Sequence, residues 1–394
     1  MSPSYDVIVV GAGMTGASIA AELSAHCRVA LLEAESHPGY HATGRSAAAF
    51  IPSYGADKRP LRALTMASQA FFMGNAEGAV TTPLLQKRGL VTIGQNWGSA
   101  AVQTACSAVN EQIPGCTHAL TKDELLTVLP SLKLEWAETA CYEPDVFDID
   151  VAATHQHFLA RHKQLGGDLI CDMAVSALEY KNACWQLQCG STLLSAKLVV
   201  NAAGAWAESL GRLAGAVPQG LQPLRRTALC FKMASGENIN HWPLVLDQGG
   251  SFYMKPDAGQ ILVSLADETP SEACDAFPEE LDIAVAVHNM QQAFDIEVRR
   301  VEHSWAGLRT FAPNRAPVFG YDHVAPNFFW AAGQGGHGIQ IAPAAARACA
   351  AMITHSPMPS DLTALGFIES EVFPSGSEPS VSNQHLIKRT PESV

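Results

Sequence analysis

Three glycines near the start of the chain have the spacing of a dinucleotide-binding turn. Gly11, Gly13 and Gly16 form G-x-G-x-x-G between the apolar run "DVIVV" and the helix-forming run "ASIAAELSAH". In such a turn the first glycine permits the tight bend, the second lets a pyrophosphate approach bare backbone, and the third lets the helix pack on the strand. Glu33 ends the next apolar run, "RVALLE", 17 positions after Gly16. A carboxylate there accepts hydrogen bonds from an adenosine ribose, so the pattern predicts binding of NAD or FAD.

Two later glycine loops favour FAD over NAD. "NAAGAW" (201–206) and "GQGGHG" (333–338) each follow an apolar run. A nicotinamide dehydrogenase seldom needs such loops so far along the chain. In a flavoprotein the isoalloxazine ring extends away from the dinucleotide fold, and later segments have to hold it.

The elements that position these residues can be predicted from hydrophobic pattern. Residues 6–10 and 28–33 read as two buried parallel strands joined by a helix, which makes one βαβ unit. Four further segments show clear patterns: a buried strand meeting a glycine turn (197–206), a hairpin (184–196), a second hairpin around Pro-Asp-Ala-Gly (250–265), and a strand, glycine loop and helix (327–353).

Composition limits the classes of protein to consider. Hydrophobic residues make up 47% and charged residues 16% of the 394 residues, as in a globular protein, and the net charge of −13 argues against a general nucleic-acid binder. The sequence has no run of about 18 apolar residues, so we expect no transmembrane segment. The ten cysteines include no C-x-x-C pair. We therefore expect no metal site, reduced thiols and a cytoplasmic location, without excluding peripheral membrane attachment.

Six blocks of sequence resemble the D-amino-acid oxidase superfamily of FAD enzymes, which includes glycine oxidase and sarcosine oxidase; the nearest resemblance is to bacterial D-arginine dehydrogenase. The blocks are "VIVVGAGMTGAS", "LLEAESHPGYHATGRSAA", "VVNAAGAWAE", "SFYMKPDAG", "WAGLRTFAPNRAPVFG" and "GQGGHGIQIAPA". The resemblance implies an α/β protein, α+β overall. A Rossmann-like FAD-binding domain would be assembled from residues 1–80, 147–215 and 303–370. A smaller, mainly antiparallel substrate domain would take 81–146 and 216–302, leaving 371–394 as a tail.

The resemblance also implies which residues contact FAD. Thr43, Gly44, Arg45 and Ser46 would form a second cradle, with amides, hydroxyls and a cation around the pyrophosphate and ribityl chain. The expected contacts are Gly11, Gly13, Met14, Thr15, Gly16, Glu33, Ala34, Thr43, Gly44, Arg45, Ser46, Ala47, Ala48, Ala174, Val175, Ala203, Gly204, Trp206, Arg309, Gly335, Gly336, His337, Gly338, Ile339 and Gln340. "GQGGHG" lacks the late cysteine that tethers flavin in sarcosine oxidases, so FAD should be noncovalent.

The family reaction transfers hydride from the α-carbon of an amino acid to flavin N5, and the imino acid hydrolyses to a 2-oxo acid and ammonia. The resemblance places Arg226 and Arg309 at the carboxylate anchor, where a guanidinium suits two parallel hydrogen bonds. Strand alternation lets only one of Arg225 and Arg226 face the site. Tyr253 matches a tyrosine above the flavin, and Tyr54 matches a lid-loop tyrosine. Gly336 and Gln340 belong to the segment beside the pyrimidine end of the ring.

Two positions depart from D-arginine dehydrogenase. Ala49 stands where that enzyme has a pocket histidine, and Leu90 stands where it has a glutamate that pairs with the substrate guanidinium. Losing that carboxylate removes the attraction for a cationic side chain. We therefore expect a neutral or hydrophobic D-amino acid in preference to D-arginine.

Other functions stay open. A secondary-amine oxidase acting on sarcosine or proline, or an FAD-dependent 2-hydroxyacid dehydrogenase, would anchor a carboxylate in the same way. A non-catalytic flavin-binding module is a more remote alternative. The electron acceptor, whether quinone, dye or oxygen, cannot be read from the residues.

Overall fold

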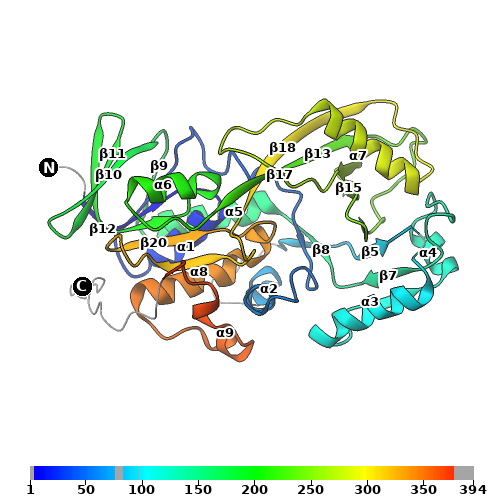
Figure 1. Cartoon of the computed structure of the whole chain (residues 1–394), viewed down its shortest axis with the longest axis horizontal. Helices are drawn as coiled ribbons and strands as arrows, with labels where there is room; N and C mark the ends of the chain where they lie inside the picture. The colour runs from blue at the N-terminus through cyan, green and yellow to red at the C-terminus, as the bar shows by residue number, and fades with distance from the viewer. Residues whose placement is uncertain (1–3, 76–82, 96, 377–394) are drawn as a thin grey trace.

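The computed structural model describes residues 4–75, 83–95 and 97–376, which are built around two large β-sheets (Figure 1). Within these residues the first sheet has eight strands, in the order β10-β11-β12-β1-β2-β9, with β20 beside β12 and β19 beside β20. Its strands are β1 (Ser4–Val10), β2 (Val29–Leu32), β9 (Asp168–Ile170), β10 (Val175–Lys181), β11 (Cys184–Cys189), β12 (Thr192–Asn201), β19 (Val318–Tyr321) and β20 (Phe328–Ala332).

The predicted βαβ unit forms the centre of the first sheet. β1 pairs in parallel with β2 and with β12, and helix α1 (Met14–Leu23) makes the crossover. Val7, Ile8 and Val9 have no exposed surface. A strand covered on both faces needs apolar side chains at every position, which explains the unbroken run "VIVV".

The two segments predicted as a hairpin and a buried strand share one long strand. β11 pairs antiparallel with residues 192–196 of β12, and the later part of β12 pairs in parallel with β1 and β20. The sequence pattern changes at the same place, because only the later part is covered on both faces. The second predicted hairpin is confirmed as β15 (Tyr253–Asp257) and β16 (Gln260–Ser264).

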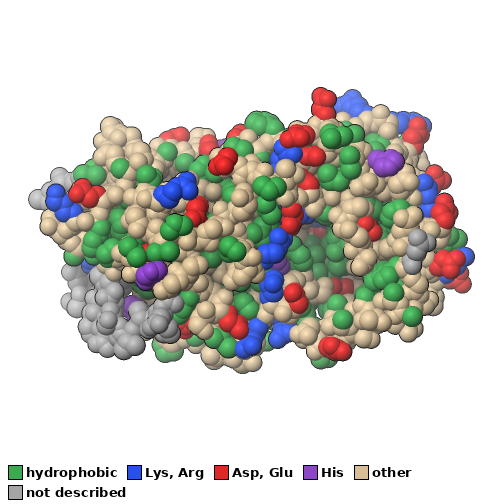
Figure 2. All heavy atoms as spheres, viewed as in Figure 1, with side chains coloured by type: hydrophobic (Ala, Val, Ile, Leu, Met, Phe, Trp, Pro, Cys, Tyr) green, Lys and Arg blue, Asp and Glu red, His purple; other side chains and the backbone are tan. Residues whose placement is uncertain are grey.

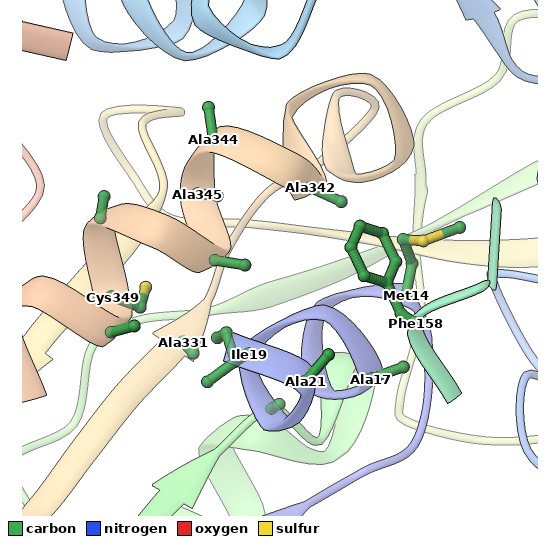
Figure 3. Packing of buried hydrophobic residues seen from close by; sticks show 14 of the residues in the cluster. Met14, Ala17, Ile19, Ala21, Phe158, Ala331, Ala342, Ala344, Ala345 and Cys349 are labelled. Carbon is green, nitrogen blue, oxygen red and sulfur yellow. The ribbon is translucent and has the colours of Figure 1, made fainter. Parts of the chain in front are cut away.

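Helices cover the first sheet, and their contacts use small residues. Helix α1 packs against α8 and α5, and Figure 3 shows α8 lying across α1. Ala17, Ala342 and Ala345 are all buried in this layer. Alanine lets helix axes approach closely, so α8, the helix after the last glycine loop, can pack tightly on α1. Besides α1, the helical segments described in this half are α2 (Arg59–Phe72), α5 (Val151–Gln164), α6 (Ala207–Leu213), α8 (Gly338–Thr354), α9 (Ser360–Ala364), η1 (Gly204–Trp206) and η2 (Glu369–Glu371).

The second sheet is mainly antiparallel and has its own core. Its order is β17-β13-β16-β15-β14-β5-β7-β6, with β18 beside β13, and only the β14–β5 pairing is parallel among the described pairs. Its other strands are β5 (Leu90–Ile93), β6 (His118–Leu120), β7 (Ala140–Glu143), β13 (Gln222–Phe231), β14 (Leu244–Asp247), β17 (Thr269–Pro270) and β18 (Val301–Phe311), and its helices are α3 (Ser99–Gln112), α4 (Lys122–Val128) and α7 (Glu280–Ala293). The mixed α/β fold class predicted from the sequence is confirmed.

A small third sheet joins the halves. It consists of β3 (Ala49–Phe50), β8 (Phe147–Ile149) and β4 (Leu85–Lys87). The predicted division into domains stays a prediction; β18, which begins at Val301, pairs with β13 of the second sheet. Of the predicted tail, residues 377–394 lie outside the described residues. Across the described ranges, no helix is both long and apolar enough to cross a membrane.

Candidate active site

The turn between β1 and α1 depends on missing side chains. Gly11 has a φ of +103°, and a Cβ there would lie 2.5 Å from the carbonyl oxygen of Ala202. A Cβ at Gly16 would lie 1.8 Å from the carbonyl oxygen of Gly11. Gly13 begins α1 and lines the cavity described below. The glycine turn thus brings backbone at the N-terminal end of α1 to the cavity wall, where helix amides can bind phosphate.

Two side chains from neighbouring segments hold this turn. The amide of Ala12 donates to Glu33 Oε2 at 3.1 Å, and the amide of Met14 donates to Thr43 Oγ1 at 2.9 Å. Glu33 is 9% exposed and lines the cavity. The predicted ribose acid and the predicted second cradle thus also fix the shape of the glycine turn.

His155 supports the same turn and was missed from the sequence. It lies on α5, is 4% exposed, and its Nε2 is 2.9 Å from the carbonyl oxygen of Ala12. Burial lowers the pKa of His155, partly opposed by that hydrogen bond, so the neutral ring acts as the donor. A Cβ at Gly39 would lie 2.9 Å from the His155 ring. One histidine therefore contacts both loops beside the predicted pyrophosphate site; its sequence context, an ordinary amphipathic helix, carries no signal for this.

A cavity of about 460 Å³ extends from the glycine turn to the second sheet. Most of the predicted site residues line it: Gly11, Gly13, Met14, Thr15, Glu33, Ala34, Thr43, Arg45, Ser46, Ala47, Ala174, Val175, Ala203, Gly204, Trp206, Arg226, Tyr253, Arg309, Gly335, Gly336, Gly338 and Ile339. Bare backbone and a buried carboxylate at one end, and arginine and tyrosine at the other, fit a flavin dinucleotide with a carboxylate-bearing substrate beyond it.

Five of the predicted cofactor residues do not line this cavity. Gly16 packs α1 on the glycine turn, and Gly44 and Ala48 line a second cavity behind the segment 44–48. The side chain of Gln340 is 3% exposed and is committed elsewhere: its Oε1 accepts from the amide of Ile51 at 3.1 Å. The fifth residue, His337, is described below.

The guanidinium of Arg45 is held by protein groups. It donates to the carbonyl oxygens of Ala276 at 2.9 Å and Ala306 at 3.1 Å, and it pairs with Asp275. The hydroxyl of Tyr40 donates to the same carboxylate at 3.2 Å. Arg45 therefore ties the segment 274–276 along the cavity wall, and much of the positive charge expected for the pyrophosphate is neutralised by Asp275.

The structure separates the two adjacent arginines of β13. Arg226 lines the cavity, donates to the carbonyl oxygen of Asp267 at 2.7 Å, and lies 3.5 Å from Glu268. Burial, then the neighbouring Arg309, lowers the pKa of Arg226. The pKa of Tyr253 would be raised by burial alone, but Arg309 and Arg226 together hold it below its usual range. The end of the cavity is therefore electropositive.

Arg309 and Tyr54 converge over Gly336. A Cβ at Gly336 would lie 2.4 Å from the hydroxyl of Tyr54 and 3.2 Å from an Arg309 guanidinium nitrogen. No hydrogen bond or ion pair joins the Arg309 guanidinium to another residue in the described part of the chain. Unused donors facing a cavity are what a substrate carboxylate requires.

His337 packs behind Tyr54. The two rings stack with centroids 4.1 Å apart and an interplanar angle of 17°. Burial lowers the pKa of His337 to about 4; a hydrogen bond to the backbone of Gln334 opposes this, and the nearby Arg309 adds to it. Its Nε2 is buried without a hydrogen-bond partner among the described residues. His337 is thus neutral near pH 7 and supports the tyrosine ring.

Ala49 and Leu90 lie in an apolar cluster beside Tyr253. Leu90 is 3% exposed and packs with Val146 and Leu244, and Ala49, Ile51, Leu246 and Tyr253 pack against them. Figure 2 shows that the face toward the viewer is hollowed between the two halves, with hydrophobic side chains inside and Lys or Arg side chains along one edge. The carboxylate that strand pairing brings beside this cluster is Glu143 of β7, which lies opposite Leu90 and accepts a hydrogen bond from Ser53.

Comparisons with known proteins identify the family of the chain. A model of the DAO family, described as "FAD dependent oxidoreductase", matches residues 6–352. Among relatives, glycine oxidase of Geobacillus kaustophilus is 26% identical over 87% of this chain and 91% of that protein. FAD-dependent oxidoreductase domain-containing protein 1 of Bos taurus is 30% identical over 40% of this chain and only 35% of its own length. The bifunctional tRNA-modifying protein MnmC of Polaromonas naphthalenivorans is 25% identical over 90% of this chain and 58% of its length. The chain thus spans about a third to somewhat over half of these last two relatives.

Solved structures share the fold over nearly the whole chain. Glycine oxidase from Geobacillus kaustophilus has a TM-score of 0.77 at 22% identity, covering 93% of this chain and 99% of that one. L-proline dehydrogenase from P. horikoshii has a TM-score of 0.78 at 20% identity, covering 91% and 96%. L-alpha-glycerophosphate oxidase from Mycoplasma pneumoniae, solved with FAD bound, has a TM-score of 0.76 at 16% identity, covering 89% and 94%. The predicted family is confirmed, whereas the nearer resemblance to D-arginine dehydrogenase stays a prediction.

Proposed function

The chain belongs to the DAO family of FAD dependent oxidoreductases, and on this premise we propose that it oxidatively deaminates a D-amino acid with a neutral or hydrophobic side chain. The observation that carries the proposal is the meeting of Arg226, Arg309 and Tyr253 at the end of the cofactor cavity. Two guanidinium groups beside a phenol form a strong anchor for a small carboxylate.

The residues have distinct tasks in this proposal. Arg309, whose donors have no protein acceptor among the described residues, binds the substrate carboxylate, and Arg226 and Tyr253 complete the anchor. The same positive charge favours the neutral form of the substrate amine, which has to lose a proton before oxidation. Bound FAD supplies the hydride acceptor. The protein's contribution is to fix the α-carbon and exclude water, and the imino acid product then hydrolyses to a 2-oxo acid and ammonia.

The substrate side chain is proposed to contact the apolar cluster. Ala49, Ile51 and Leu246 pack beside Tyr253, and none of them can pair with a cation. A lysine or arginine side chain there would lose water against these apolar groups, and Glu143, the carboxylate opposite Leu90, is already engaged by Ser53 and Cys116. This supports the preference for methionine, leucine or phenylalanine over arginine or lysine.

The decisive experiment is anaerobic mixing of the purified yellow protein with a panel of amino acids. D-Met, D-Leu and D-Phe should bleach the oxidised flavin band fastest, and D-Arg, D-Lys and the L-isomers slowly. Much faster bleaching by D-Arg would contradict the assignment of the side chain. If no member of the panel bleached the flavin, a non-catalytic flavin module would be favoured instead. Repeating the panel with a dye and with oxygen separates a dehydrogenase from an oxidase.

A second candidate is oxidation of glycine or a secondary amine. The observation that favours it is the match to glycine oxidase over 87% of this chain. The carboxylate anchor would be the same, so the panel includes glycine, sarcosine and L-proline. Faster flavin reduction by one of these than by any D-amino acid would replace the first proposal with this one.

A further inference from the structure

Glu143 is a buried carboxyl group that the proposed reaction does not use. It ends β7 of the second sheet and is 2% exposed. Its Oε1 accepts hydrogen bonds from the amide of Ser53 at 3.0 Å and from Cys116 Sγ at 3.2 Å, and its Oε2 accepts from the Ser53 hydroxyl. Within the described residues no Lys, Arg or His pairs with it. Burial raises the pKa of Glu143, and the Ser53 and Cys116 hydrogen bonds oppose that change.

Through Ser53, Glu143 holds the loop of residues 51–58, which we call the tyrosine loop. Ser53 immediately precedes Tyr54. The Tyr54 ring stacks on His337 at 4.1 Å. Gly55, with a φ of +75°, lies so close that a Cβ would be 2.6 Å from His337 Nε2. Glycine is needed here both for the positive φ and for the close approach to His337, so the loop is packed in a specific position against His337.

In this position Tyr54 lies at the end of the cavity that Arg309 and Gly336 line. Its hydroxyl and the Arg309 guanidinium approach the same point over Gly336. Tyr54 is 38% exposed and does not itself line the cavity; its hydroxyl lies beside Gly336 and Arg309, which do.

Three elements hold the tyrosine loop, and they belong to different parts of the fold. Gln340 of α8 accepts from the amide of Ile51, and Arg62 of α2 donates to the carbonyl oxygen of Ala56 at 3.2 Å. Glu143 supplies the hydrogen bonds from the second sheet, which also carries Arg226 and Tyr253. The Glu143–Ser53 contact thus fixes Tyr54 relative to the substrate anchor.

We propose that Glu143 is a positioning residue for amino-acid oxidation: by binding Ser53 it holds Tyr54 closed over the substrate carboxylate. The inference rests on the proposed function, because its kinetic effect needs an amino-acid substrate. A loop that is already closed spares the substrate the cost of ordering it, so the contact affects substrate capture more than the chemical step.

The test is a double-mutant cycle between Glu143→Ala and Tyr54→Ala. Glu143→Ala should raise KM for the best amino acid about tenfold, the size of a lost hydrogen bond to a charged group, with a smaller change in kcat. In the Tyr54→Ala background it should have little further effect. Glu143→Gln should restore much of the wild-type KM, because the amide oxygen can still accept from Ser53. Effects that multiply independently would overturn the proposal, since they would mean that Glu143 acts on general stability.

Controls keep the result interpretable. Glu138→Ala changes an exposed glutamate just before β7 and should leave KM unchanged. If Glu143→Ala fails to fold, Ser53→Ala removes one of the two Ser53 hydrogen bonds while keeping the carboxyl group, and it should show the same dependence on Tyr54.

A second readout separates failure of this inference from failure of the proposed function. Amide hydrogen exchange over residues 51–58 should be faster in Glu143→Ala than in wild-type holoprotein, and this needs no substrate. Unchanged exchange there would refute the positioning role even if amino acids are oxidised. Faster exchange with no amino acid reducing the flavin would instead refute the proposed function.

Discussion

At the level of single residues, surroundings decide chemistry more than residue type. Arg225 and Arg226 are adjacent in β13 and so point to opposite sides of the strand. Arg225 is held between Glu279 and Asp282 of the α7 region, with its second pairing at 3.0 Å. Arg226 lines the cavity beside Tyr253. Arg225 is therefore tied into ion pairs away from the cavity, whereas Arg226, although 3.5 Å from Glu268, faces the cavity and can contact a ligand.

This contrast gives a matched pair of variants. Arg226→Ala should lower kcat/KM for the best amino acid by roughly 30-fold or more, because removing one partner of a buried charged pair costs at least about 2 kcal/mol. Arg225→Ala should change kcat/KM by less than about threefold, because its guanidinium pairs with Glu279 and Asp282 and does not line the cavity. Steady-state kinetics at constant FAD content measure both. Equal losses in the two variants would remove Arg226 from the anchor.

The attachment of FAD is also decided by single residues. Cys349 is buried inside α8, whereas the exposed Cys274 lines the cofactor cavity. We predict noncovalent binding, because none of the motifs predicted to bind the flavin contains a cysteine. Acid precipitation should release all the yellow colour into the supernatant. Colour retained in the pellet would contradict this prediction, and loss of that colour in Cys274→Ser would identify the attachment point.

At the level of elements, the cofactor site depends on close approach between helices and strands. The Gly11–Gly16 turn lets α1 rest on β1, and α8 then packs on α1 through small side chains such as Ala345, which is 4% exposed. Figure 3 shows Ala342 and Ala345 on the part of α8 above α1. The position of the glycine turn is therefore coupled through α1 to the position of α8, whose first turn lines the cavity.

A larger side chain in this layer should separate the helices. We expect Ala345→Leu to destabilise the holoprotein by about 1–3 kcal/mol, because extra methylenes force a close-packed core apart. Urea unfolding followed by flavin absorbance measures the change. Ala101→Leu, at an exposed position of α3, is the control and should cost less than about 0.5 kcal/mol. Equal stability of the two variants would show that α1 and α8 are not closely packed.

At the level of the whole molecule, an acidic protein encloses a positive site. The net charge is −13, yet Arg226 and Arg309 make one end of the cavity electropositive. Several histidines are buried in neutral form; burial lowers the pKa values of His155, His162 and His337. Stability of the molecule is therefore coupled to pH through groups in both the cofactor half and the active-site end.

This coupling has a definite sign for His337. Its pKa falls from 6.5 to about 4 on folding, so between these pH values the unfolded chain binds more protons than the folded one. The free energy of unfolding should therefore decrease as pH falls through this window, by up to about 3 kcal/mol from this group. Urea unfolding at pH 7.5 and 4.5 should show a smaller pH-dependent loss in His337→Gln than in wild type. An identical loss would mean that His337 is not buried in neutral form.

Much of the cofactor half could be predicted from the sequence because its signals are local. The strands at 6–10 and 28–33, the turn between them and the hairpin at 250–265 follow from short-range patterns, and the structure confirms each of them. Glu33 is predicted to be the ribose-binding acid from its position at the end of the second strand. Most of the predicted site residues line one cavity, and their roles in binding FAD and substrate stay predictions.

Contacts between distant segments were decided only by the tertiary structure. His155 meets Ala12 across 143 positions, and Glu143 meets Ser53 across 90. Neither histidine nor glutamate has a distinctive local pattern, since their roles arise from burial and from a partner elsewhere in the chain. The same reason explains Arg45, which carries an expected cation yet is paired with Asp275.

The sequence by itself therefore determined the family and its FAD cofactor, and it predicted the residues of the FAD site and the residue types available to hold a carboxylate. These depend on backbone conformations that a few neighbouring residues dictate, above all where only glycine fits. The tertiary structure decided which arginine enters the cavity, which donors stay free and what holds Tyr54 in place. Those properties depend on how two sheets, assembled from separated segments, bring charges and hydrogen-bonding groups together.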